Sequence, residues 1–220
     1  MQLTKYRFSN AINAFFEMPT ETAAELLPDH LQPLELRHQS SILAVTAFHF
    51  TESMVGDYHE VVLAVIVPPM VKAADVFPKS AYYPFVVGTS TSASREHAIE
   101  RWHLPHYMAD VHVDLEEKDG TVDVRVRDED SPILDFRITA HKWSIVDQLY
   151  QCFMTDDSNR YRVDMHLHGR FTEHEDEQGR LTLHEHPMTE LIFDQDVATH
   201  PFREMWMKDG MQVFEELETI

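Results

Sequence analysis

The sequence contains few of the features that identify a protein's class directly, such as cysteines, long apolar stretches or a signal peptide. It has one cysteine, Cys152, in 220 residues, so no intramolecular disulfide can form, and no neighbouring group favours a reactive thiolate. The longest apolar stretches, such as residues 61–67, fall short of the about 20 residues that a membrane-spanning helix needs. The first ten residues contain no apolar signal-peptide core. We therefore expect a cytoplasmic protein with no membrane segment.

Basic residues are also scarce. There are 18 Lys and Arg against 38 Asp and Glu, which gives a formal net charge of −20. Because no run of Lys or Arg interrupts this charge, the surface would repel a phosphate backbone or an anionic bilayer, and we expect neither nucleic acid nor membrane as a partner. The 6 glycines and 11 prolines form no linker, and no repeat is evident, so residues 1–220 are predicted to form a single domain.

Alternation with a period of two predicts strands at residues 41–50, 133–141, 160–171 and 181–186, and a nearly continuous apolar run predicts another strand at residues 59–67. In residues 41–50 both alternating sets are mostly apolar, as in a strand that is covered on both faces. A capping box with Thr22 and Glu25 predicts a short helix that stops at Pro28. Residues 202–217 carry apolar side chains suited to a terminal element that packs on the rest of the fold.

The clearest hairpin is centred on Asp119 and Gly120, because this dipeptide suits a two-residue type I′ turn. Such a turn pairs residue 118 with residue 121, and this register places one apolar set on one face: Val111, Val113, Leu115, Val122, Val124 and Val126. With the other strands and two or three helical pieces, the pattern predicts an α+β protein that is mainly antiparallel β. The expected architecture is a closed or curled β-barrel with an internal pocket and a few peripheral helices.

Three segments carry the similarity to a known family. L-P-D-H-L at residues 27–31 precedes G-D-Y-H-E at residues 56–60, and E-R-W-H-L-P-H follows at residues 100–106. This ordered set resembles the acetoacetate decarboxylase superfamily, in which an L-P-x-x-L segment precedes a G-x-Y-x-E strand and then a G-R-E-x-x-G-[FY]-P-K turn. The similarity covers about residues 24–113, and the hairpins beyond fit the family's β-rich second half more loosely.

The resemblance implies a scaffold without the family's usual chemistry. In that family a lysine attacks a ketone to form a Schiff base, and an adjacent cationic group keeps the lysine nucleophilic. The lysine's position is taken here by His106, and the cationic neighbour's by Tyr107. The family's arginine falls on about Glu17, and a further carboxylate falls near Val45. The chain is thus expected to lack the Schiff-base lysine and to need no cofactor.

The resemblance also supplies candidate site residues. Glu60 matches the family's glutamate directly, and Glu100 matches the glutamate of G-R-E when counted back from Pro105. We expect Glu60 and His106 to lie within direct or one-water reach and to act as acid and base on a ligand. A pocket formed by the two matched segments would bring further ligand-binding residues, and these are Tyr58, Arg95, Glu100, Trp102 and Tyr107.

The leading hypothesis is a barrel that binds a small oxo-acid or related metabolite, with lyase-like turnover by Glu60 and His106 left open. The alternative is a non-enzymatic barrel that carries an apolar small molecule or serves as an assembly partner. Lys79, in a local F-P-K, and Lys142 remain alternatives for the missing nucleophile. The oligomeric state is also open, with a homo-oligomer among the alternatives.

Fifteen histidines raise the question of a metal site. His166, His168, His184 and His186 would lie close together if residues 160–186 formed a hairpin that turns near Gly179, and imidazoles are common zinc ligands. They share their face with charged residues, however, which is typical of a solvated sheet face. We therefore predict no functional metal.

Overall fold

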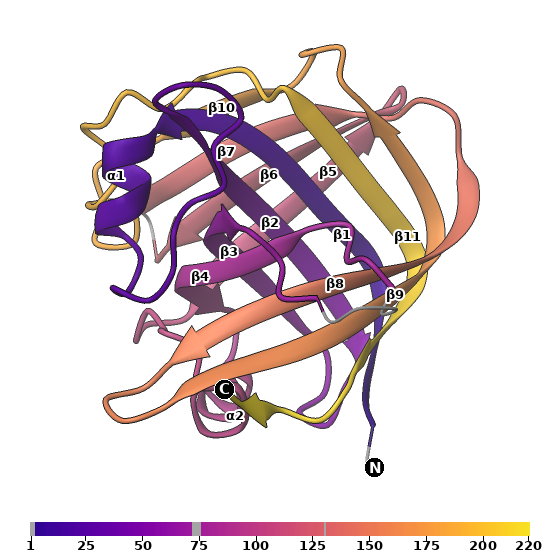
Figure 1. The fold of residues 1–220 in the computed structure, drawn as a ribbon. Helices are drawn as coiled ribbons and strands as arrows, with labels where there is room; N and C mark the ends of the chain where they lie inside the picture. Colours follow the sequence, from indigo (N-terminus) through magenta and orange to yellow (C-terminus); the bar gives the residue numbers. More distant parts are fainter. Residues whose placement is uncertain (1–2, 72–75, 130) are drawn as a thin grey trace.

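The computed structural model describes residues 3–71, 76–129 and 131–220. Within these residues, seven strands close into a barrel in the order β11-β1-β2-β3-β4-β8-β9, and β9 pairs back with β11 (Figure 1). All neighbours run antiparallel except β4 and β8. The predicted closed barrel is confirmed. Its strands are β1 (Thr4–Pro19), β2 (Ser40–Glu52), β3 (Tyr58–Val67), β4 (Ala81–Thr89), β8 (Ser144–Thr155), β9 (Arg160–His174) and β11 (Arg203–Phe214).

A second sheet packs against the outside of the barrel and has the strand order β10-β7-β6-β5. Its strands are β5 (Val111–Lys118), β6 (Thr121–Asp128), β7 (Ser131–Thr139) and β10 (Arg180–Leu183), and a short strand β12 (Glu218–Thr219) extends the first sheet at β9. The two sheets enclose a core of aliphatic and aromatic side chains from β1, β2, β3 and the small sheet. The molecule therefore has two interiors, one inside the barrel and one between the sheets.

The predicted hairpin joins β5 to β6 in the expected register, with Lys118 opposite Thr121 and Val113 opposite Val126. Asp119 and Gly120 have φ values of 51° and 79°, the positive values that a type I′ turn requires. Five of the six apolar residues assigned to its inner face are buried. Leu115 is only partly buried, because β5 is the edge strand and Leu115 lies in its more exposed half.

Strand β2 lies between the two interiors, and each of its two sets of apolar side chains packs into a different one. One set lies against the barrel interior, and its members are Ile42, Ala44, Thr46, Phe48 and Phe50. Leu43, Val45 and Ala47 belong to the core between the sheets. The prediction of a strand covered on both faces is confirmed.

Two helices complete the described fold: α1 (Thr20–Glu25) and α2 (Ser92–Trp102). The expected capping box is wrong. Helix α1 starts after Pro19 without a side-chain cap, and the Thr22 hydroxyl instead donates to Gln195. Helix α2 does have a cap, since Thr91 Oγ1 accepts from the Ser94 amide, and it ends at His103 in a left-handed conformation.

The expected hairpin between residues 160–171 and 181–186 is also wrong. Strand β9 pairs with β8 and β11, whereas β10 pairs with β7 in the other sheet. His168 therefore lies opposite Met211. His184 instead contacts Asp135 on β7, so the four histidines do not form the cluster that a hairpin would have made.

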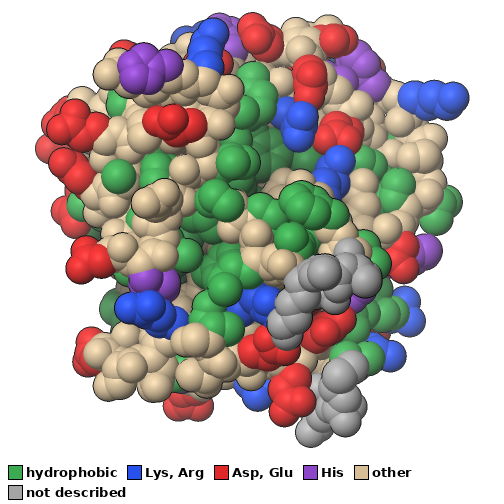
Figure 2. All heavy atoms as spheres, viewed as in Figure 1, with side chains coloured by type: hydrophobic (Ala, Val, Ile, Leu, Met, Phe, Trp, Pro, Cys, Tyr) green, Lys and Arg blue, Asp and Glu red, His purple; other side chains and the backbone are tan. Residues whose placement is uncertain are grey.

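Charge and hydrophobic surface are separated on the face shown in Figure 2. Hydrophobic side chains gather in a hollow in the middle of this face, while many acidic side chains lie toward its edge. None of the helices in the described residues is long and apolar enough to cross a bilayer.

Candidate functional site

A cavity of about 120 Å³ occupies the barrel interior. Every barrel strand contributes inward-pointing side chains to it, and α2 covers one end with Ser94, His97, Ala98 and Trp102. Most of its wall is hydrophobic, with representative members Phe48, Phe50, Leu167, Phe171, Met205 and Phe214. A largely apolar cavity with a few polar groups is the usual form of a small-molecule site.

Glu60 places a carboxyl group in this apolar space. It lies on β3 between Tyr58 and Val62, and the period of two sends all three side chains into the cavity. Among the described residues, the Glu60 carboxyl has no hydrogen-bond or ion-pair partner within contact distance. Removal from bulk water disfavours the charged form and raises the pKa of Glu60 to about 7. Both protonation states are thus populated near neutral pH.

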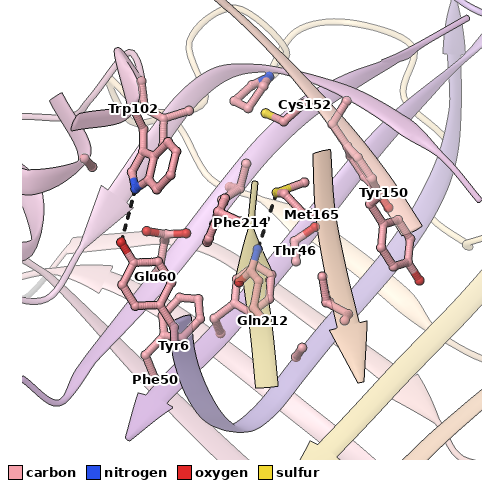
Figure 3. Close-up of a pocket in the computed structure, with 18 of the residues that line it drawn as sticks. Tyr6, Thr46, Phe50, Glu60, Trp102, Tyr150, Cys152, Met165, Gln212 and Phe214 are labelled. Carbon is pink, nitrogen blue, oxygen red and sulfur yellow. Dashed lines mark hydrogen bonds between the residues drawn. The ribbon is translucent and has the colours of Figure 1, made fainter. Parts of the chain in front are cut away.

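A hydrogen-bonded set lies beside Glu60 at the α2 end of the cavity (Figure 3). Trp102 Nε1 donates to Tyr6 Oη over 3.2 Å, and Tyr6 Oη lies 2.6 Å from His97 Nε2. Because the indole can only donate, Tyr6 accepts from Trp102 and directs its own proton toward neutral His97. Burial raises the pKa of Tyr6 to about 12 and lowers the pKa of His97, which keeps both side chains uncharged near neutral pH.

The structure brings together three of the residues that the sequence indicated, since Tyr58 and Trp102 line the cavity with Glu60. Burial raises the pKa of Tyr58, so its hydroxyl stays protonated. Arg95 and Glu100 lie on α2 but are not lining residues. Arg95 pairs with Asp110 at 2.6 Å, and Glu100 is exposed.

His106 is not brought to Glu60. The Val87 amide donates to the Pro105 carbonyl and the Tyr107 amide donates to the Val87 carbonyl, which fixes this segment along the edge of β4 opposite β3. The His106 ring turns back on its own backbone, with Nδ1 2.7 Å from the Tyr107 carbonyl oxygen. His106 does not line the cavity that holds Glu60, and no hydrogen bond joins the two side chains in the described residues.

Tyr107 belongs to a separate cluster outside the cavity. Its hydroxyl donates to Asp128, and its ring packs edge-on against His186. Asp128 also lies 3.5 Å from His186 Nε2. This cluster joins the segment after α2 to the second sheet, and it provides no ligand contact in the barrel.

The described lysines and arginines leave the cavity lining without a cation. Lys79 Nζ does not line the cavity, because it is bound to Glu173 at 2.8 Å and lies 5.6 Å from the ring centroid of Phe171, and Lys142 is exposed. Lys72 lies outside the described residues. Within the described part of the chain, no side chain that faces Glu60 could attack a ketone as a nucleophilic amine.

One group of potential metal ligands occurs in the described residues, and it lies away from the cavity lining: His141, His174 and Asp176. The His174 ring is already engaged at both nitrogens. Nε2 bonds to Thr139, and Nδ1 accepts from the Asp176 amide at 3.3 Å. The His174 ring therefore links the end of β9 to Thr139 at the end of β7, and we assign no metal ion to this group.

Tyr6, His97 and the polar residues of β11 were not identified from the sequence. Tyr6 lies on β1, and His97 lies on α2, 91 residues later in the chain. No local spacing marks such a pair, because closure of the barrel alone brings them together. Glu60 and Tyr58, by contrast, lie in one short segment, G-D-Y-H-E at residues 56–60, and were identified from its resemblance to the family's G-x-Y-x-E strand.

Comparisons with known proteins agree with this architecture. The family model described as acetoacetate decarboxylase matches residues 2–214. A solved acetoacetate decarboxylase is similar with a TM-score of 0.67 at 12% identity, over 100% of this chain and 90% of that chain. An acetoacetate decarboxylase from Legionella pneumophila is similar with a TM-score of 0.61 at 14% identity, over 98% and 86%.

A third solved structure is the enduracididine biosynthesis enzyme MppR complexed with pyruvate. It has a TM-score of 0.63 at 8% identity, over 100% of this chain and 91% of that chain. A search of curated proteins found no match. Identities this low show a shared fold, whereas the family model covers nearly the whole sequence. The chain therefore belongs to the acetoacetate decarboxylase family.

Proposed function

We propose that the chain binds a small carbonyl compound in the barrel cavity and that Glu60 exchanges a proton with it. The observation that carries this proposal is a carboxyl group in an apolar cavity, without a partner among the described residues and with a pKa of about 7. A general base is most effective when its pKa lies near the working pH, and perturbed carboxyl groups in cavities are common at catalytic sites.

The proposed step is enolisation. The Glu60 carboxylate removes a proton from the carbon next to the carbonyl group, the electrons of that C–H bond form a C=C bond, and the carbonyl π electrons move to the oxygen. Tyr58, two residues earlier on the same face of β3, is the proposed donor to the developing oxyanion. After the Glu60 carboxyl group has exchanged its proton with solvent, transfer of a solvent-derived proton from Glu60 to the carbon re-forms the carbonyl group and completes the exchange.

Family membership supports a carbonyl ligand, because one structural neighbour is a complex with the oxo-acid pyruvate. Small oxo-acids are therefore within the proposed class. The proposal uses Glu60, Tyr58 and Trp102 of the residues that the sequence indicated. It assigns no role to His106, which does not line the cavity. It also requires no Schiff base, and borohydride reduction in the presence of a ketone should leave no adduct on any lysine.

A carrier of apolar small molecules is the second candidate function. The observation that favours it is the largely hydrophobic wall of the cavity. A carrier would bind its ligand in the cavity without moving a proton, and therefore turnover separates the two functions.

The test is hydrogen–deuterium exchange at the methyl groups of butane-2,3-dione in D₂O, followed by proton NMR. We expect the wild-type protein to accelerate exchange and Glu60→Gln to reduce the acceleration by a factor of about 100 or more. Glu96→Gln is the matched control, because Glu96 is exposed on α2. Binding without accelerated exchange in the wild type would contradict the catalytic proposal and favour the carrier.

A further inference from the structure

We infer that Tyr6 and His97 form a proton relay that connects the carboxyl group of Glu60 with solvent outside the barrel. The inference rests on the proposed role of Glu60 as an acid–base group, because that role requires the Glu60 proton to exchange with solvent. Three features carry it: the hydrogen bonds around the Tyr6 hydroxyl, the exposure of His97 at the surface, and the burial of Glu60.

The first feature is the geometry at the Tyr6 hydroxyl. A hydroxyl group has one proton to donate and two lone pairs that accept, so it serves at most about three partners. Trp102 Nε1 uses one acceptor position at 3.2 Å, and His97 Nε2 uses a second position at 2.6 Å. Because the indole can only donate, the bond from Trp102 is the same in every protonation state of its neighbours. One position of Tyr6 Oη therefore remains for a group in the cavity.

We assign this remaining position to the side of Glu60. Tyr6 lines the same cavity as Glu60, and Figure 3 shows the Tyr6 hydroxyl beside the Glu60 carboxyl group. Burial is the main reason why the pKa of Tyr6 rises to about 12, and the charge of Glu60 adds to the rise, so the two groups lie within electrostatic reach. No direct hydrogen bond joins them in the described residues, and one oxygen atom of water or of the ligand is the proposed bridge.

The second feature is that His97 extends from the cavity to the surface. It lies in the middle of α2, is half-buried, and bonds to Tyr6 through Nε2. His97 Nδ1 has no hydrogen-bond partner among the described residues, and it is not among the buried polar atoms that lack a partner. This nitrogen is therefore open to solvent. Tyr6 is only 2% exposed, so water reaches the pair through His97.

The charges around His97 keep its ring neutral at rest. Burial lowers the pKa of His97, Arg101 on the same helix lowers it further, and Glu100 opposes both effects. From β1, Tyr6 faces Nε2 without a charge, since burial keeps the Tyr6 hydroxyl protonated. A neutral imidazole has one protonated and one free nitrogen, and exchange between these two forms is what a relay requires.

The third feature is the separation of Glu60 from bulk water. Its removal from water raises the pKa of Glu60 to about 7, and most of the surrounding wall is hydrophobic. Apolar side chains cannot pass a proton, whereas a hydroxyl group next to an imidazole can. Among the described residues that line the cavity, His97 is the one imidazole. The lining therefore offers one chain of side chains along which the Glu60 proton can leave.

The transfer conserves every proton. At rest the Tyr6 hydroxyl donates to His97 Nε2, and His97 carries its own proton on Nδ1. Glu60 passes its proton through the bridging oxygen to Tyr6 Oη, the Tyr6 proton moves to Nε2, and the Nδ1 proton is released to water. His97 is then the Nε2–H tautomer, and the reverse sequence brings a solvent proton to the Glu60 carboxylate. Because Tyr6 gains one proton as it loses another, no phenolate accumulates.

The test measures how fast the Glu60 carboxyl group exchanges its proton, and it needs no substrate. The full-length chain is labelled with carboxyl ¹³C-glutamate and studied at the pKa of Glu60 in dilute buffer, where line broadening gives the exchange rate. We expect one averaged resonance in the wild type. His97→Ala should slow the exchange by about tenfold or more, and imidazole should restore it by entering the space left by the side chain. The bulkier buffer bis-Tris at equal concentration should not restore it.

Two further variants separate a relay from a structural role. His97→Gln keeps a hydrogen bond to Tyr6 but has no titratable nitrogen, so it should slow the exchange as much as His97→Ala. Tyr6→Phe should slow the exchange without rescue by imidazole, because the inner half of the relay is lost. His112→Ala is the matched control, since His112 is exposed on β5. If Tyr6→Phe fails to fold, the two His97 variants decide the inference.

The outcomes separate this inference from the proposed function. Exchange at the wild-type rate in His97→Gln would show that His97 only positions Tyr6, and the same rate in His97→Ala would show that water reaches Glu60 through the cavity. Either result would overturn the relay and leave the proposed proton transfer intact. Slow exchange with rescue by imidazole, but without methyl exchange in the wild type, would support the relay and contradict the proposed transfer to carbon.

Discussion

The two interiors of this molecule share strands but differ in composition. The core between the sheets is formed by side chains such as Leu63, Val124 and Leu134, all of which are fully buried. The barrel interior contains a cavity, a carboxyl group and two amides whose oxygens, on Asn13 and Gln212, have no partner in the part of the chain that the structure describes. One strand serves both interiors, because β3 sends Leu63 outward and Val62 inward.

The difference indicates a division of roles. Close-packed hydrophobic side chains contribute stability in proportion to the apolar area they bury. Polar groups without partners in the barrel interior reduce stability, and such groups persist mainly where function requires them. The outer core therefore stabilises the fold that holds Glu60 in an otherwise unfavourable place.

The largest expected effect is the loss of stability on placing a charge between the sheets. Val113→Asp should lower the free energy of unfolding by about 4 kcal/mol, because the new carboxylate would be buried without a partner. His112→Asp on the exposed face of the same strand is the control and should change it by less than about 0.5 kcal/mol. Equal effects in urea denaturation would refute the assignment of the two faces of β5.

A matched pair of truncations sharpens the comparison of the interiors. Leu134→Ala should cost about 2–5 kcal/mol, because its side chain is packed on all sides. Met165→Ala should cost less than half as much, since Met165 faces existing empty space and has fewer contacts to lose. The measurement is chemical denaturation of both variants. A cost for Met165→Ala that matches the cost for Leu134→Ala would show that the barrel interior is packed as tightly as the outer core.

The smallest expected stability effect depends on pH. Folding raises the pKa of Glu60 from 4.5 to about 7, so its contribution to stability is present below the unfolded value and is lost as pH rises through the folded value. At 1.36 kcal/mol per pKa unit the loss reaches at most about 3 kcal/mol, less if water enters the cavity. As pH rises from about 5 to about 8, the wild type should therefore lose stability relative to Glu60→Gln.

The control for this dependence is Glu96→Gln, which removes the same charge from the exposed face of α2. Its stability should follow the wild type across the same range. A pH-independent difference between Glu60→Gln and the wild type would show that the carboxyl group is not desolvated by folding.

The local sequence pattern was sufficient to predict those elements whose structure is determined by residues close together in the chain. The Asp119-Gly120 turn fixes the register of its own hairpin, and the alternation in β2 follows from cores on both faces. Strands β1, β4 and β8 were not predicted. In β1, register shifts near Phe8 and apolar side chains on both faces interrupt the simple alternation that would reveal a strand.

The features that were predicted wrongly depend on pairing between strands that are far apart in the sequence. Strand β9 follows β8 and is then closed by β11, so β10 joins β7 instead of forming a hairpin with β9. The same limit applies to the site. Glu60 and Tyr58 lie in one local segment that resembles a family motif and were identified from it, whereas the position of His106 depends on backbone hydrogen bonds between its neighbours and Val87.

The most direct test of the central claim is the pKa of Glu60 itself. Carboxyl ¹³C NMR on protein labelled at glutamate can follow this group through a pH titration, with Glu60→Gln identifying its resonance. Our account predicts a pKa of about 7, because the group is held in the apolar cavity. A pKa near the ordinary value of 4.5 would show a hydrated or paired carboxylate, and would contradict the role of Glu60 as the acid–base group of the barrel.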